Sequence, residues 1–135
     1  MKSSIRIGMV LLTAVIGAAT VTARGDSYVG FAKQWTVVNF RDPVLVKGQF
    51  VSGPVLIVHD SLKMSRGEAC TTFYRFDKAQ GQQEEIVSFH CKPRMTDARA
   101  ETTQLVTTTS PDIACRRLVE YQIAGDEEAH GVPAK

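Results

Sequence analysis

Three histidines and three cysteines are the residues of this chain that a binding or redox site would use. Each histidine lies at or just beyond the end of an apolar segment: His59, His90 and His130. Strand ends in a small barrel gather at its rim, where these histidines and a sulfur or carboxylate would suit copper or zinc. Asp60 is a candidate to orient His59 through a hydrogen bond. The spacing matches no recognised ligand motif, so the first expectation is no cofactor, with copper or zinc as the alternative.

Two of the cysteines lie at the ends of a predicted β-hairpin. Residues 69–76 and 85–91 are rich in branched and aromatic side chains, and residues 77–84 form a polar loop. If the hairpin is symmetric, Cys70 lies opposite Cys91, and Tyr74 and Phe76 point to the core. Opposed residues in an antiparallel pair have Cα atoms about 4.5 to 5.5 Å apart, within the range of a disulfide. The sequence therefore predicts a structural disulfide between Cys70 and Cys91.

The third cysteine is predicted to be a free thiol. Cys115 shares one face of a predicted strand with Val119 and Tyr121, which favours a small buried hydrophobic residue. Three cysteines allow three single bridges, so a bond from Cys115 to Cys70 or Cys91 stays open. The chain has no Gly-x-Ser-x-Gly elbow and no recognised cysteine-protease pattern around Cys115. We therefore assign no catalytic residue.

The first 23 residues have the pattern of a secretory signal peptide. Lys2 and Arg6 precede an uncharged apolar run, and Val21 and Ala23 place small residues at the positions a signal peptidase accepts. An uncleaved membrane anchor is the alternative, although the apolar stretch is shorter than the usual span of about 20 residues. The pattern predicts a periplasmic or secreted protein, in contact with a membrane only if this segment stays attached.

Residues 24–135 are predicted to form one antiparallel β domain. Pro and Gly divide this part into short pieces rich in Val, Thr, Phe and Tyr, which is typical of a small barrel or sandwich of six to seven short strands. Apolar and polar side chains alternate over residues 44–51, which predicts one strand there, and Ser52-Gly53 is a predicted turn. Residues 60–66 form the single helical candidate, capped by Asp60 or Ser61 and ended by Gly67. The tail from about residue 125 is predicted to be irregular.

Charge and composition limit the function classes. The 16 basic residues include Lys2 and Arg6, so the predicted mature domain balances 14 basic against 14 acidic residues. A neutral domain gives no reason to expect nucleic acid as a partner. We expect an exported accessory module of the cell envelope, with a binding or structural role toward another envelope protein or a small ligand. The alternatives are a copper or zinc protein, or a redox accessory protein, using the rim histidines, and a small hydrolase.

Overall fold

A computed structural model describes residues 17–23, 25–110 and 113–135. Within these residues the chain forms a single mixed sheet of ten strands and one short helix. The elements are β1 (Ala18–Ala23), β2 (Ser27–Val29), β3 (Lys33–Val46), β4 (Gln49–Asp60), α1 (Ser61–Ser65), β5 (Thr71–Asp77), β6 (Gly81–Phe89), β7 (Lys92–Met95), β8 (Thr103–Ser110), β9 (Ile113–Gln122) and β10 (Glu128–Gly131).

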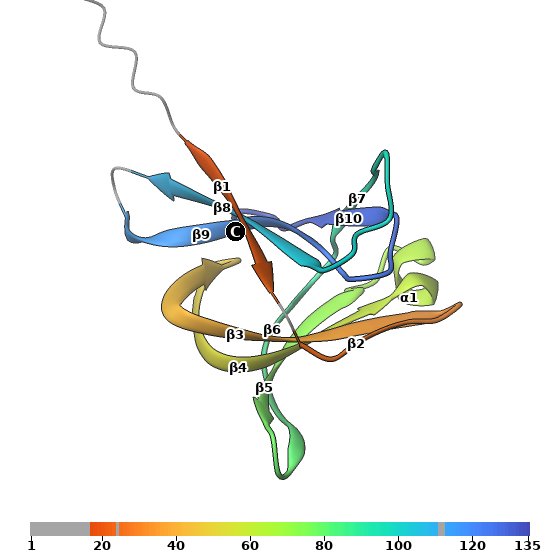
Figure 1. The fold of residues 1–135 in the computed structure, drawn as a ribbon, viewed down its shortest axis with the longest axis horizontal. Helices are drawn as coiled ribbons and strands as arrows, with labels where there is room; N and C mark the ends of the chain where they lie inside the picture. The colour runs from red at the N-terminus through yellow and green to blue at the C-terminus, as the bar shows by residue number, and fades with distance from the viewer. Residues whose placement is uncertain (1–16, 24, 111–112) are drawn as a thin grey trace, which may run out of the picture.

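The sheet folds over into two layers, which Figure 1 shows one above the other. One layer holds β2 to β6, and the other holds β1 and β7 to β10. A short parallel pairing of Val44 and Leu45 in β3 with Arg116 and Arg117 in β9 joins them. The expectation of a mostly β domain is confirmed. The count of six to seven short strands is wrong, and the sheet is mixed and does not close into a barrel.

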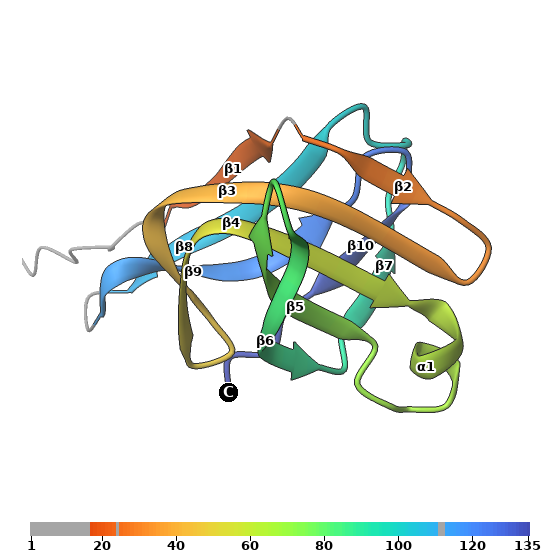
Figure 2. The same cartoon turned by 90° about the horizontal axis from the view of Figure 1, so that it is seen from below.

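The longest hairpin differs from the sequence prediction. Residues 44–51 do not form one strand, because Lys47 and Gly48 turn the chain between β3 and β4 with positive φ angles of 45° and 79°. Two adjacent residues with positive φ are typical of a type I′ turn, whose twist matches that of the flanking strands. The predicted turn at Ser52-Gly53 lies inside β4 instead. β3 bends where its pairing with β4 is interrupted between Phe40 and Val44 (Figure 2).

The core lies between the two layers. Its fully buried aromatic members are Phe73, Phe89 and Tyr121. Phe73 and Tyr121 have none of their surface exposed, and Phe89 has 1% exposed. Phe73 packs edge-on against the Tyr121 ring, with ring centroids 6.2 Å apart. Because alternate residues of β4 face inward, Val55 and Ile57 are buried together with His59. The same alternation that builds the core thus carries a histidine into it.

The helix prediction is confirmed, and the tail differs from its prediction. Asp60 caps α1, because its Oδ1 accepts hydrogen bonds from the backbone N–H groups of Leu62 and Lys63 at 3.0 and 3.1 Å. Gly67 follows with a φ of 71°. The tail contains β10, which lies between β7 and β9 and buries Ala129 and His130.

The predicted signal peptide lies mostly outside the described residues. Its last six residues, Ala18–Ala23, form β1 at the edge of β8. Among the described residues, no helix has the length and apolar character needed to cross a membrane.

Candidate metal centre

Three side chains from distant parts of the chain converge at the α1 end of the core. His59 lies near the end of β4, His130 lies in β10, and Cys91 lies in the link between β6 and β7. His59 and His130 have ring centroids 4.0 Å apart, and all three side chains are fully buried. One ligand atom from each lies within 4.8 Å of the others. Two nitrogens and one sulfur at this spacing are a donor set for a transition metal.

Gln34 fixes which nitrogen of His59 carries the proton. The two residues are opposite one another across β3 and β4, and His59 Nδ1 lies 2.7 Å from Gln34 Oε1. The Gln34 amide nitrogen donates to the Gly30 carbonyl at 3.3 Å, so its oxygen must face His59. An amide oxygen only accepts, so Nδ1 is the donor and Nε2 keeps its lone pair. Metal-binding histidines are commonly oriented in this way.

The free lone pair of His59 has no hydrogen-bond partner. Nε2 is buried and unpaired among the described residues, a situation that costs free energy unless a ligand or water satisfies it. Burial, together with the neighbouring His130 ring, lowers the pKa of His59 to about 4. The ring is therefore neutral at neutral pH, which is the form that binds a metal.

His130 is held between acidic groups and an aromatic ring. Its Nδ1 lies 3.6 Å from Cys91 Sγ and 3.6 Å from Glu128 Oε1, while its Nε2 lies 3.5 Å from Asp126 Oδ2. The ring stacks on Tyr121 with centroids 5.0 Å apart. Burial opposes the charge of Asp126, but the His130 ring and the Glu128 backbone N–H together lower the pKa of Asp126. The Nε2 atom of His130 is buried and, among the described residues, has no hydrogen-bond partner, so this ring also has a nitrogen that a ligand could satisfy.

Cys91 supplies the sulfur of the cluster. Burial and the neighbouring Cys70 thiol raise the pKa of Cys91 to about 12, so the metal-free protein holds a neutral thiol here. Bonds of about 2.0 Å to nitrogen and 2.3 Å to sulfur at tetrahedral angles place N and S ligands about 3.5 Å apart. The 3.6 Å between Cys91 Sγ and His130 Nδ1 is close to that separation. Metal binding at Cys91 would release the thiol proton.

Two more sulfurs lie beside Cys91. The Sδ of Met64, on α1, lies 3.8 Å from Cys91 Sγ, and the Cys70 Sγ lies 3.1 Å from it. The Cys70 sulfur also accepts a hydrogen bond from the Cys91 backbone N–H at 3.2 Å. A thioether next to a His₂Cys set is a soft donor of the kind found in copper sites.

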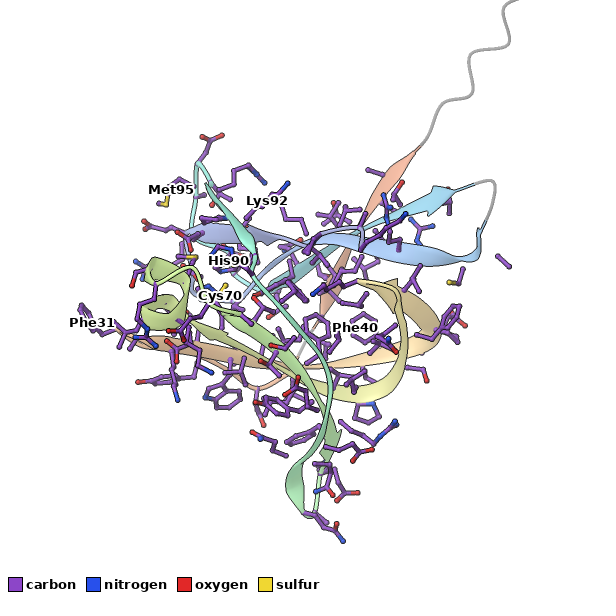
Figure 3. The ribbon with its side chains drawn as sticks, turned by 180° about the vertical axis from the view of Figure 1, so that it is seen from behind. Phe31, Phe40, Cys70, His90, Lys92 and Met95 are labelled. Carbon is purple, nitrogen blue, oxygen red and sulfur yellow. The ribbon has the colours of Figure 1, made fainter. Side chains whose placement is uncertain are left out.

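The structure brings together two of the three predicted histidines. His59 and His130 meet at Cys91, but His90 is exposed on the segment between β6 and β7 (Figure 3). His90 and Cys91 are adjacent residues, and only Cys91 turns inward. The predicted partner Asp60 caps α1 rather than orienting His59, a role that Gln34 takes. The proximity of Gln34 to His59 is a consequence of the β3–β4 register, which the Lys47-Gly48 turn sets together with the shift in pairing between Phe40 and Val44.

The predicted hairpin register is wrong by one residue near the cysteines. Thr71 lies opposite Phe89, and Phe73 opposite Val87. The chain turns earlier than expected, because Asp77 accepts hydrogen bonds from the backbone N–H groups of Ala79 and Gln80 and Gly81 already begins β6. Tyr74 and Phe76 are consequently half-buried, and Phe73 takes the core position. Cys70 and Cys91 still meet, because both lie just beyond the strand ends.

All three cysteines are thiols in this structure. The disulfide between Cys70 and Cys91 therefore stays a prediction. Cys115 is half-buried rather than in the core, because an irregularity in the β8–β9 pairing near Thr107 and Leu118 shifts the buried face of β9. It lines an apolar cavity of about 760 Å³ at the opposite end of the sheet, with Phe50 and Arg116.

Comparisons with models of protein families, with curated proteins and with solved structures give no match for this chain. Any functional conclusion rests on the site itself.

Proposed function

We propose that this protein is an exported accessory protein of the cell envelope that binds copper, as Cu(I), between His59, Cys91 and His130. The observation that carries the proposal is the buried, unpaired Nε2 of His59 beside a second histidine and a thiol. A buried polar atom without a partner calls for an explanation, and a metal ion accounts for it. The exported location is supported by the N-terminal pattern of the sequence.

The choice of copper over zinc rests on charge and softness. Cu(I) bound to one thiolate and two neutral imidazoles carries no net charge, which suits ligands that are fully buried. Zn²⁺ with the same ligands would keep one positive charge. The Met64 thioether beside Cys91 adds a soft donor. Thioethers are not among the usual zinc ligands, which are Cys, His and carboxylates, so this donor favours Cu(I). Such a protein would carry or store copper, or exchange one electron through it.

Titration of the reduced protein with Cu(I), against a chromophoric Cu(I) chelator, tests the proposal. We expect one tightly bound equivalent in the wild type. Cys91→Ser and His130→Asn should each weaken binding by more than about 100-fold, beyond the loss usual when only a hydrogen-bond partner of a ligand is removed. Cys115→Ser and His90→Asn are the matched controls, and both should bind like the wild type.

Three results would overturn the proposal. If a folded wild-type protein binds neither Cu(I) nor Zn²⁺ tightly, the metal site is rejected, and a binding or structural role without a metal takes its place. Tight Zn²⁺ binding without Cu(I) binding would keep the ligands and reject copper. Equal losses in Cys91→Ser and Cys115→Ser would show that the measured metal binds elsewhere. Thermal unfolding of each variant separates lost ligands from lost folding.

A further inference from the structure

The two buried thiols of Cys70 and Cys91 lie in direct contact beside the metal cluster. Their sulfurs are 3.1 Å apart, closer than the roughly 3.8 Å between two thiolate ligands bonded at about 2.3 Å to one tetrahedral metal. Cys70 is held by its backbone, because its N–H donates to the Phe89 carbonyl at 3.1 Å and its carbonyl accepts from the Asp60 N–H at 2.8 Å. These bonds tie Cys70 to the last residues of β4 and β6, next to His59 and just before Cys91. The pair is therefore held together by the same elements that build the cluster.

The Cys91 sulfur belongs both to the metal cluster and to the contact with Cys70. Cys91 Sγ lies 3.6 Å from His130 Nδ1 on one side and 3.1 Å from Cys70 Sγ on the other. The thiolate is the form of cysteine that binds a metal, and a sulfur bonded to another sulfur has lost that charge. Cys91 can therefore bind the metal as a thiolate or form a disulfide with Cys70, but it cannot do both at once.

We propose that Cys70 and Cys91 are a redox pair that controls metal binding: the reduced pair leaves Cys91 free to hold copper, and the disulfide removes it from the ligand set. This inference rests on the proposed function. In the oxidising step, a protein or small-molecule disulfide R–S–S–R accepts two electrons from the two thiols. The Cys70–Cys91 bond forms, the R–S–S–R bond breaks, and the two thiol protons leave with two R–SH molecules. In this switch Cys70 acts on the site through Cys91 and is not itself a ligand.

The segment that covers the Cys70–Cys91 pair consists of α1 and the residues that follow it, and this segment can open locally. α1 contains no buried residue, and residues 65–69, which follow Met64, are exposed up to the buried Cys70. Segments with few buried contacts open at low free-energy cost. Met64 is the part of the helix that contacts Cys91, and Figure 3 shows Cys70 next to the helix. Opening of α1 would expose the thiols to a disulfide donor and the cluster to an incoming metal.

The test compares Cu(I) affinity before and after oxidation with oxidised glutathione, which is then removed. A Cys115→Ser background prevents bridges through the third cysteine. In that background we expect oxidation to remove two hydrogen atoms by mass and to weaken Cu(I) binding by more than about 100-fold. A reductant should restore binding. Adding Cys70→Ser, which retains an acceptor for the Cys91 N–H, should leave tight binding that is insensitive to the same treatment.

The outcomes separate this switch from the copper proposal. If the reduced protein binds no copper, the proposed function fails first. If the reduced protein binds copper but no internal disulfide forms, or the disulfide form binds as tightly, the switch is overturned and the copper site stands. If Cys70→Ser weakens binding to reduced protein as much as Cys91→Ser does, Cys70 is a ligand, and its separate redox role is rejected.

Discussion

Replacement of Gln34 tests the geometric basis of the metal site without touching a ligand. Gln34 is 8% exposed, and its Oε1 accepts the Nδ1–H of His59 at 2.7 Å. In Gln34→Met, a side chain of similar length fills the same space but offers no comparable acceptor. The His59 N–H then loses its partner, and the hydrogen bond no longer fixes the tautomer that leaves the Nε2 lone pair free.

Two magnitudes follow from this loss. Removing the hydrogen-bond partner of a metal-binding histidine typically costs about 10- to 100-fold in affinity, or about 1.4 to 2.8 kcal/mol. A buried donor left without a partner destabilises the metal-free fold by about 1 to 3 kcal/mol. For a domain of this size, that lowers Tm by roughly 3 to 5 °C for each kcal/mol.

The assay is Cu(I) competition against a chromophoric chelator, together with thermal unfolding of the metal-free protein. Gln34→Glu retains an acceptor oxygen and should bind Cu(I) at least as well as the wild type. Gln104→Met is the control, because the Gln104 amide, in β8, bonds among the described residues to Thr102 alone and not to the metal cluster. Gln34→Met binding Cu(I) within about threefold of wild type, a difference under about 0.7 kcal/mol, would refute the tautomer argument.

Two further predictions concern pH and export. The unfolded chain protonates His59 near pH 6.5 and the folded chain only near pH 4, so the unfolded state binds more protons between these values. The metal-free protein should lose up to about 3 kcal/mol of unfolding free energy from this group as pH falls from 6.5 to 4. Denaturant unfolding measures this, and stability that is flat or rises over that interval would contradict it. Expressed in an exporting bacterium, the protein should have the mass of a chain that starts at Arg24, without β1; retention of residues 1–23 would reject cleavage.

Local patterns in the sequence predicted the features that depend on neighbouring residues. Branched and aromatic side chains between Pro and Gly predicted a β domain, and Asp60 with Gly67 predicted the helix, because capping and turn geometry involve residues only a few positions apart. The meeting of Cys70 and Cys91 was also predicted, although through a register that is wrong by one residue. Their position beyond the strand ends made the contact tolerant of that error.

The tail shows where local patterns were insufficient. The charged, Gly-containing sequence of residues 126–131 predicts an irregular tail. In the structure β10 instead inserts between β7 and β9 and buries His130 against Tyr121. A short polar segment becomes a strand when two existing strands offer their free backbone groups, which no pattern within the segment records. His90, which has the more strand-like surroundings, faces solvent.

The sequence by itself determined the kinds of donor available and the β character of the chain, since these follow from residue types and their near neighbours. Only the tertiary structure decided which donors meet. His59, Cys91 and His130 lie on three separate segments, and the folding of one sheet onto itself brings them within ligand distance. Gln34 then selects the nitrogen of His59 that keeps its lone pair, because strand register places side chains opposite one another across any separation in sequence.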